Sequence, residues 1–460
     1  MSSSLILSHQ LNTPYIPASA QSRLVYVLLS VQIGDLQSEP VPVTLDLVVD
    51  ASDSMRIPLI TEEQFEELAA LGAVREVITD GIPVWRFENV PPGFTKDCPR
   101  PLDSVKLAIL AAVQSLRSED RCGLVAFAGS AQRLAPISPA SRSGNMIKGV
   151  EKLDEIDLGD DTRLSAGLAI AVKELMRDDR SRRGSLRRIV MLTDGFGMDE
   201  ADTLRWGQKA AQAGISVSTM GLGSEFNDDL LVKLAETSGG NAYFVEEPSE
   251  ILYAFANELS AAQSVALRSL ELKLKLFGGV ELRRAYRVKP SISDLGLPYQ
   301  VDNSTSILLG DLEVQAPPAV LLEMIVPPRS AGRYRLAQAV LAHTDKDGLP
   351  GAKVSTDLLV EAGPDTMRAA NLDPQVMNLV ETVSAYKLQT RALEDVERGD
   401  IAGATTKLRA ASTRLLGLGE EELALAAMQE ADNLDQQGAL SATGTKKLRY
   451  ETRRLTQRLS

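Results

Sequence analysis

The chain has few of the residues that most catalytic and metal sites use. Its 460 residues include two histidines, His9 and His343, and two cysteines, Cys98 and Cys122. Zinc sites and histidine-based catalytic sites gather such residues in one place, so the composition argues against both classes. Two cysteines are also too few for a disulfide framework, and this favours a reducing compartment.

Aromatic residues and long apolar runs are scarce as well. Aromatic residues make up 4% of the chain, and the net charge is −13. Few stacking side chains and repulsion from phosphates argue against nucleic acid as a partner. The sequence has no run of about 18 apolar residues, and its N-terminus lacks the pattern of a signal peptide. We therefore expect a cytoplasmic protein without a membrane span.

Strand-like and helix-like segments alternate between residues 43 and 263. The segments that read as buried strands are VPVTLDLVVD (41–50), CGLVAFAG (122–129), RRIVMLTDG (187–195), ISVSTMGLG (215–223) and NAYFVEE (241–247). Segments with helical periodicity lie between them. This alternation predicts an α/β fold, doubly wound around a mostly parallel sheet. Residues 56–101 interrupt it with a predicted short helix and a hairpin, which we interpret as an inserted subdomain.

Three further regions flank this α/β domain at 43–263. Residues 264–363 alternate at period two between turn signals, which is typical of a β-sandwich. Residues 364–460 are predicted to be helical, with glycines at the junctions. The N-terminal segment 1–42 contains one long strand, RLVYVLLSVQI (23–33). It has no place in the α/β sheet, so we expect it to pair with the sandwich.

Oxygen-bearing side chains gather where predicted strands end. Asp50, Ser52 and Ser54 follow the first strand, Thr162 precedes a helix, and Asp194 follows RRIVMLTDG. Ligands of open parallel sheets bind at the carboxyl ends of the strands, where these loops meet. Hydroxyl and carboxylate oxygens without histidine or cysteine favour Mg²⁺, with Mn²⁺ or Ca²⁺ as other hard cations that the set could hold.

Those five residues, with the contexts TRLSAGLAIA and VMLTDG, resemble the metal-ion-dependent adhesion site of von Willebrand factor type A domains. The resemblance covers roughly residues 43–263. It implies that Ser52, Ser54 and Thr162 contact a divalent metal and that Asp50 and Asp194 act directly or through water. It further implies that a carboxylate from a partner protein completes the coordination. Similar intracellular bacterial proteins often work beside AAA ATPases of the MoxR kind, which are the leading partner class by resemblance.

The sequence departs from the family pattern in two places. Asp53 and Asp161 stand where the family usually has glycine, so an unusually acidic rim is expected, which would repel an acidic partner residue. The insertion at 56–101 carries Trp85 and Phe87, which could anchor a partner or could form a small core of the insertion.

The sequence thus indicates a non-enzymatic protein that binds a partner through a metal. One alternative is a structural scaffold that assembles through its helical tail, with a metal site that is not essential. A second alternative is a magnesium-dependent hydrolase, for which no histidine base lies near the predicted loops.

Overall fold

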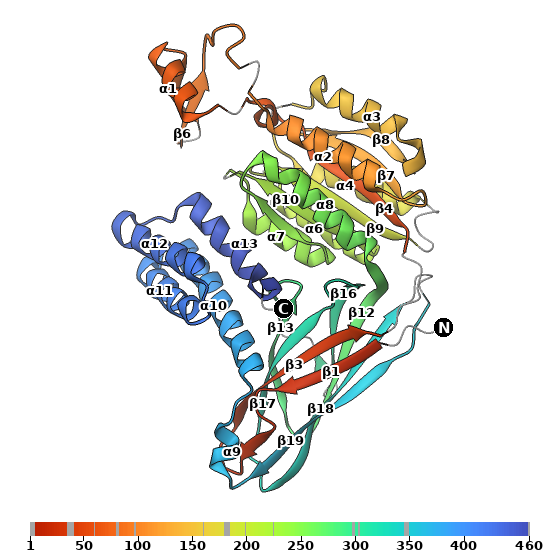
Figure 1. Ribbon diagram of the computed structural model, residues 1–460, viewed down its shortest axis with the longest axis vertical. Coiled ribbons are helices and arrows are strands. Elements are labelled where there is room, and N and C mark those ends of the chain that lie inside the picture. The colour runs from red at the N-terminus through yellow and green to blue at the C-terminus, as the bar shows by residue number, and fades with distance from the viewer. Residues whose placement is uncertain are drawn as a thin grey trace.

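A computed structural model describes residues 5–34, 41–58, 60–79, 82–95, 98–159, 161–178, 185–197, 199–223, 225–296, 300–301, 304–344 and 349–458. It comprises an α/β domain, a β-sandwich and a C-terminal group of helices (Figure 1). Within the described residues, no helix combines the length and apolar character needed to cross a bilayer.

The α/β domain is built on a mostly parallel six-stranded sheet. Its strand order is β11-β10-β9-β4-β7-β8, with bounds Ala242–Val245, Ile215–Leu222, Leu186–Thr193, Val43–Asp50, Arg121–Phe127 and Ala131–Pro139. All eight residues of β4 are buried, because helices cover both faces of this central strand. The predicted fold class is confirmed.

The edge strand β8 was missed from the sequence. It pairs antiparallel with β7. Its sequence, AQRLAPISP, contains two prolines, which remove backbone donors and argue against a central strand. An edge strand tolerates them because one side needs no sheet partner.

Helices form one layer on each face of this sheet (Figure 1). One core packs beneath α2 (Pro101–Ser115), α3 (Gly144–Glu151) and α8 (Ile251–Gln263). The other packs beneath α4 (Leu164–Arg177), α6 (Glu200–Gln212) and α7 (Asp228–Ser238). A Cβ added to Gly167 of α4 would lie 2.7 Å from Cγ1 of Val48 on β4. This close approach brings the start of α4 to the end of the central strand.

The sandwich consists of a five-stranded and a six-stranded sheet. The first has the order β1-β3-β17-β13-β14, with bounds Leu5–Leu11, Arg23–Ile33, Ala319–Val326, Glu281–Lys289 and Ser293–Asp294. The second has the order β15-β16-β12-β18-β19-β2, with bounds Gln300–Val301, Ser304–Glu313, Val265–Leu276, Gly332–Thr344, Val354–Gly363 and Tyr15–Pro17. Strands β12 and β13 flank the Gly278–Gly279 turn but belong to different sheets. β3 pairs with β17, so strands on both sides of the α/β domain build one sandwich.

One buried carboxylate holds the two connections to the α/β domain together. Asp120 accepts hydrogen bonds from the backbone N–H of Val43, at 2.8 Å, and from Nε2 of Gln263, at 3.1 Å. Val43 begins the first strand of the domain and Gln263 ends its last helix. The domain therefore begins and ends at one place.

The C-terminal helices pack against the rest of the chain. After the short α9 (Thr366–Ala370) come α10 (Pro374–Glu397), α11 (Ile401–Gly417), α12 (Glu421–Gln437) and α13 (Ala442–Arg458). α10 covers the outer face of the five-stranded sheet. Tyr450 of α13 is 3% exposed and packs in the α/β core. Arg449 and Arg453 of α13 form ion pairs with Asp228 and Glu236 at 2.6 and 3.0 Å. The basic end of the tail thus docks on acidic residues of its own chain.

The insertion at 56–101 projects from the α/β domain (Figure 1). It contains α1 (Glu62–Ala70), which begins with a capping box of Thr61 and Gln64, and the hairpin β5–β6 (Val74–Thr79 and Ile82–Phe87). The turn residues 80 and 81 lie outside the described residues. Leu68 is fully buried, so the insertion has a small apolar core of its own.

Candidate metal centre

Three loops bring the predicted residues together at the carboxyl edge of the sheet. Asp50 ends β4, Ser52 and Ser54 lie in the loop after it, and the loop after β9 carries Asp194. Oγ of Ser54 lies 3.0 Å from Oγ of Ser52 and donates a hydrogen bond of 2.8 Å to Oδ1 of Asp194. The two loops are therefore in direct contact through their side chains.

Thr162 reaches the same place from the loop before α4. A Cβ added to Gly195 would lie 2.5 Å from Oγ1 of Thr162, so only glycine leaves room for this hydroxyl beside Asp194. The loop is held by a hydrogen bond of 3.0 Å from the N–H of Arg163 to the carbonyl of Ala128. Asp199 accepts a hydrogen bond of 2.9 Å from the N–H of Ser165 in the first turn of α4, which ties this helix to the start of α6.

Local hydrogen bonds orient Asp50. Its Oδ1 accepts from the N–H of Ser52 at 2.9 Å, and its Oδ2 accepts from Oγ1 of Thr193 at 2.6 Å. Thr193 in turn accepts from the N–H of Gly195 at 3.1 Å. We did not assign Thr193 a role from the sequence. The signal for this role was its position as the last residue of β9, directly before Asp194.

The structure places no cationic side chain of a described residue in an ion pair with either carboxylate. Neither Asp50 nor Asp194 forms an ion pair with a lysine, arginine or histidine among the described residues. Burial, and then the charge of Asp50, raise the pKa of Asp194 to about 7. Burial also raises the pKa of Asp50. Both shifts express the cost of holding negative charges together away from water, and a bound cation would remove that cost.

The donor set fits a hard divalent cation. It combines two carboxylates with the hydroxyls of Ser52, Ser54 and Thr162. Among the described residues, no three histidine, cysteine or acidic side chains are placed to hold a metal, so coordination here would depend on the hydroxyls. Mg²⁺ commonly takes one or two protein carboxylates and keeps water at its other positions. Ser52 is buried and Ser54 is exposed, so the centre opens to solvent on one side.

Each of the two aspartates predicted at the rim has an arginine near it. Asp53 lies in a short helical turn, 53–56, and its carboxylate is 3.4 Å from Nη1 of Arg56. Asp161 lies 3.8 Å from Nη2 of Arg163. Both carboxylates are exposed, and each has an arginine beside it. The expected repulsion of an acidic partner is therefore partly balanced within the chain.

Of the two predicted aromatic anchors, only Phe87 has a side chain among the described residues. Phe87 ends β6 and is 38% exposed. The backbone of Trp85 lies in β6, but its side chain lies outside the described residues. For both residues, the two interpretations, a partner contact or part of the core of the insertion, stay predictions.

Two parts of the chain match known families. Residues 98–257 match the model of the von Willebrand factor type A domain, and residues 374–458 match a model described as the Sll0103-like, C-terminal alpha-helical domain. The first match begins near the end of the insertion, so the loop with Asp50, Ser52 and Ser54 lies ahead of it.

Several proteins are similar over most of the chain. The protein named "Uncharacterized protein sll0103" from Synechocystis sp. is 26% identical over 323 residues, which cover 68% of this chain and 74% of that protein. A solved structure of a von Willebrand factor type A protein from Catenulispora acidiphila is 14% identical, with a TM-score of 0.73, and the match covers 98% of this chain and 97% of that one. The ArnB paralog VWA2 from Sulfolobus acidocaldarius is 15% identical, with a TM-score of 0.56 and 98% of each chain covered. These two structures show a shared fold.

Proposed function

We propose that this chain, which carries a von Willebrand factor type A domain and a Sll0103-like helical domain, binds a partner protein through a divalent metal, with Mg²⁺ as the preferred ion. The observation that carries this proposal is that Asp50 and Asp194 meet beside three hydroxyls without a cation from any described residue. The metal would be held by Asp50, Ser52, Ser54, Thr162 and Asp194.

The partner would supply a carboxylate to the open side of the metal. The exposure of Ser54 supports this, because a ligand from outside can reach that side. Arg56 and Arg163 at the rim offset the charges of Asp53 and Asp161, which makes an approaching carboxylate less costly. An AAA ATPase of the MoxR kind is the partner class that we propose, and the protein would then serve as an adaptor in an intracellular complex.

We propose binding without turnover. His9 lies on β1 and His343 on β18, so both histidines belong to the sandwich and neither could act as a base at the centre. The two carboxylates at the centre are needed for the cation itself. A second metal would need further carboxylates there, and the described residues provide no such group.

Titration calorimetry with MgCl₂ tests the metal centre. We expect Mg²⁺ to bind the wild type, and Asp194→Asn to bind it at least about tenfold more weakly, since loss of one carboxylate removes charge and a ligand. Asp53→Asn is the matched control, because it removes one charge from the neighbouring loop but no proposed ligand. Absence of Mg²⁺ and Mn²⁺ binding in the wild type would contradict the proposal, as would equal losses in the two variants.

A pull-down from cell extract tests the partner. We expect at least one bound protein to be lost with EDTA and regained with excess Mg²⁺, and to be absent with Asp194→Asn. A partner set that is unchanged by chelator and by Asp194→Asn, but lost when the helical tail is removed, would support the scaffold alternative instead.

A further inference from the structure

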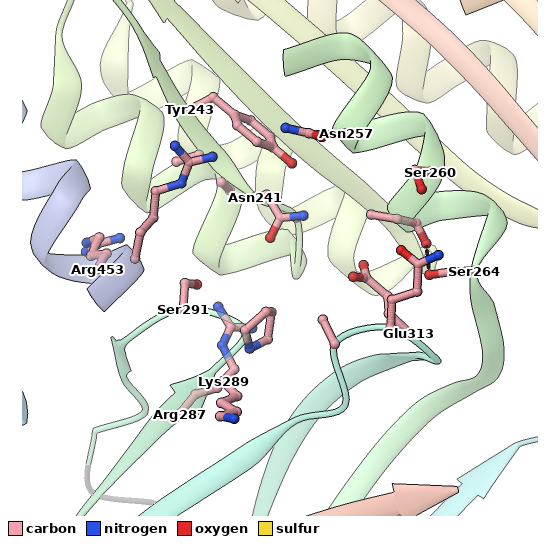
Figure 2. Close-up of a pocket in the computed structure, with 18 of the residues that line it drawn as sticks. Asn241, Tyr243, Asn257, Ser260, Ser264, Arg287, Lys289, Ser291, Glu313 and Arg453 are labelled. Atoms are coloured by element: carbon pink, nitrogen blue, oxygen red, sulfur yellow. Dashed lines mark hydrogen bonds between the residues drawn. The ribbon is translucent and has the colours of Figure 1, made fainter. Parts of the chain in front are cut away.

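A pocket of about 490 Å³ lies where the three parts of the chain meet. The α/β domain contributes residues around the start of β11 and from α8, the sandwich contributes the end of β13 and the loop after β16, and the tail contributes α13. Figure 2 shows Arg287, Lys289 and Ser291 on the sandwich side, facing Asn241, Tyr243 and Asn257 of the α/β domain, with Arg453 of α13 alongside. Ligand pockets of about 300–1,000 Å³ are typical for small molecules.

A buried polar network supports the wall of this pocket. Glu258 of α8 is 1% exposed. Its carboxylate accepts hydrogen bonds from Arg188 at 2.7 Å, Ser218 at 2.7 Å, Asn241 at 3.2 Å and Tyr243 at 2.8 Å. Arg188 also donates to Glu313 of the sandwich at 3.1 Å. Asn241, Tyr243 and Glu313 line the pocket, so their side chains are held in place from behind.

Three cationic side chains at the pocket form no ion pair among the described residues, although Glu236 and Glu313 in the same lining act on Arg287 from a longer distance. Arg453 pairs with Glu236, whereas Arg287, Lys289 and Arg454 form no ion pair with any described residue. Arg454 lies over the ring of Tyr243, 5.7 Å from its centroid. Nε of Arg287 is buried without a hydrogen bond, and burial lowers the pKa of this guanidinium. Such an arrangement is costly unless an anion joins it.

We propose that this pocket binds a small molecule bearing phosphate groups. The phosphate would lie against Arg287, Lys289 and Arg454, since guanidinium groups match phosphate oxygens in charge and in geometry. The amide of Asn257 and the hydroxyls of Ser260 and Ser291 form no hydrogen bond with a described side chain, and they are available for the polar remainder of the ligand. A ligand held there would contact all three parts of the chain. This site lies away from the metal centre and does not depend on the proposed function.

Pyrophosphate is a suitable probe. Titration calorimetry of the full chain in metal-free buffer should show binding, and Arg287→Gln should weaken it at least about tenfold. Arg283→Gln is the matched control, because Arg283 is exposed on the same strand and does not line the pocket. Lys289→Gln, at a partly exposed position, provides a second pocket variant should Arg287→Gln fail to fold. Asp194→Asn should bind pyrophosphate as the wild type does.

Three results would overturn the proposal. The first is an absence of pyrophosphate binding in the wild type. The second is an equal loss with Arg283→Gln and with the pocket variants, which would reflect net charge alone. The third is tighter binding of citrate than of pyrophosphate, which would assign the pocket to carboxylates instead.

Discussion

The two edges of the α/β sheet hold carboxylates in opposite ways. Near the amino edge, Glu258 has an internal cation, Arg188, and accepts hydrogen bonds from three further side chains. At the carboxyl edge, Asp50 and Asp194 have hydroxyl and backbone donors but no cation from the described residues. Paired charge stabilises a junction between parts of the chain, whereas unpaired charge leaves a place for an ion from outside.

The largest expected effect concerns the paired carboxylate. Glu258→Gln should lower the free energy of unfolding by about 3 kcal/mol, because it leaves Arg188 with only part of its buried countercharge. Urea unfolding followed by circular dichroism measures this. Glu271→Gln, which breaks an exposed ion pair with Lys273, should cost less than about 1 kcal/mol. If Glu258→Gln and Glu271→Gln lowered the free energy of unfolding equally, the distinction between the two edges would be lost. Asp194→Asn should not lower the free energy of unfolding as much as Glu258→Gln does.

A smaller effect is expected for Gly195→Ala. The added Cβ would displace the hydroxyl of Thr162, so Mg²⁺ affinity should fall about tenfold while both carboxylates remain. Calorimetry with MgCl₂ measures the change. Gly144→Ala is the control, since nothing lies within 4 Å of a Cβ added there. Unchanged affinity in Gly195→Ala would exclude Thr162 from the metal centre.

The smallest effect concerns Asp46, a further buried carboxylate, which forms no ion pair and no hydrogen bond through its side chain among the described residues. Burial, and then the charge of Glu174, raise its pKa well above the usual range. The folded state therefore binds a proton that the unfolded state loses, so ionisation of Asp46 lowers stability as pH rises from its unfolded pKa towards its folded pKa. At low pH, below both values, the penalty is absent.

The free energy of unfolding of Asp46→Asn should accordingly rise relative to that of the wild type as the pH goes from 5 to 8. One pKa unit is worth about 1.4 kcal/mol, and the unpartnered amide offsets part of this, so we expect a net gain of about 1 kcal/mol. Urea unfolding at both pH values measures it. A difference between variant and wild type that is independent of pH would show that Asp46 does not titrate in this range.

The metal centre could be predicted from the sequence because its parts are local. Asp50, Ser52 and Ser54 follow one strand at fixed spacing, and Asp194 follows another, so strand assignment alone brings them to one edge. Whether these residues bind metal stays a prediction. The role of Thr193 could not be predicted in this way, because its hydrogen bond to Asp50 depends on the pairing of β9 with β4.

The pocket could not be predicted in this way. Its cations come from residues 287, 289 and 454, and its wall from residues 241–264 and 313. Only the packing of the three parts brings these together. Strands β12 and β13 illustrate the same limit, because their turn and period-two pattern are visible in the sequence but their division between two sheets is not.

The hydrogen bonds of Asp120 hold the two ends of the α/β domain side by side. Because Val43 and Gln263 share one carboxylate, the domain is a continuous segment with adjoining ends. Adjoining ends allow a domain to be inserted into a host fold, or its chain order to be permuted, without rearranging the host. A sandwich with β3 ahead of the α/β domain and β12 after it is such a host.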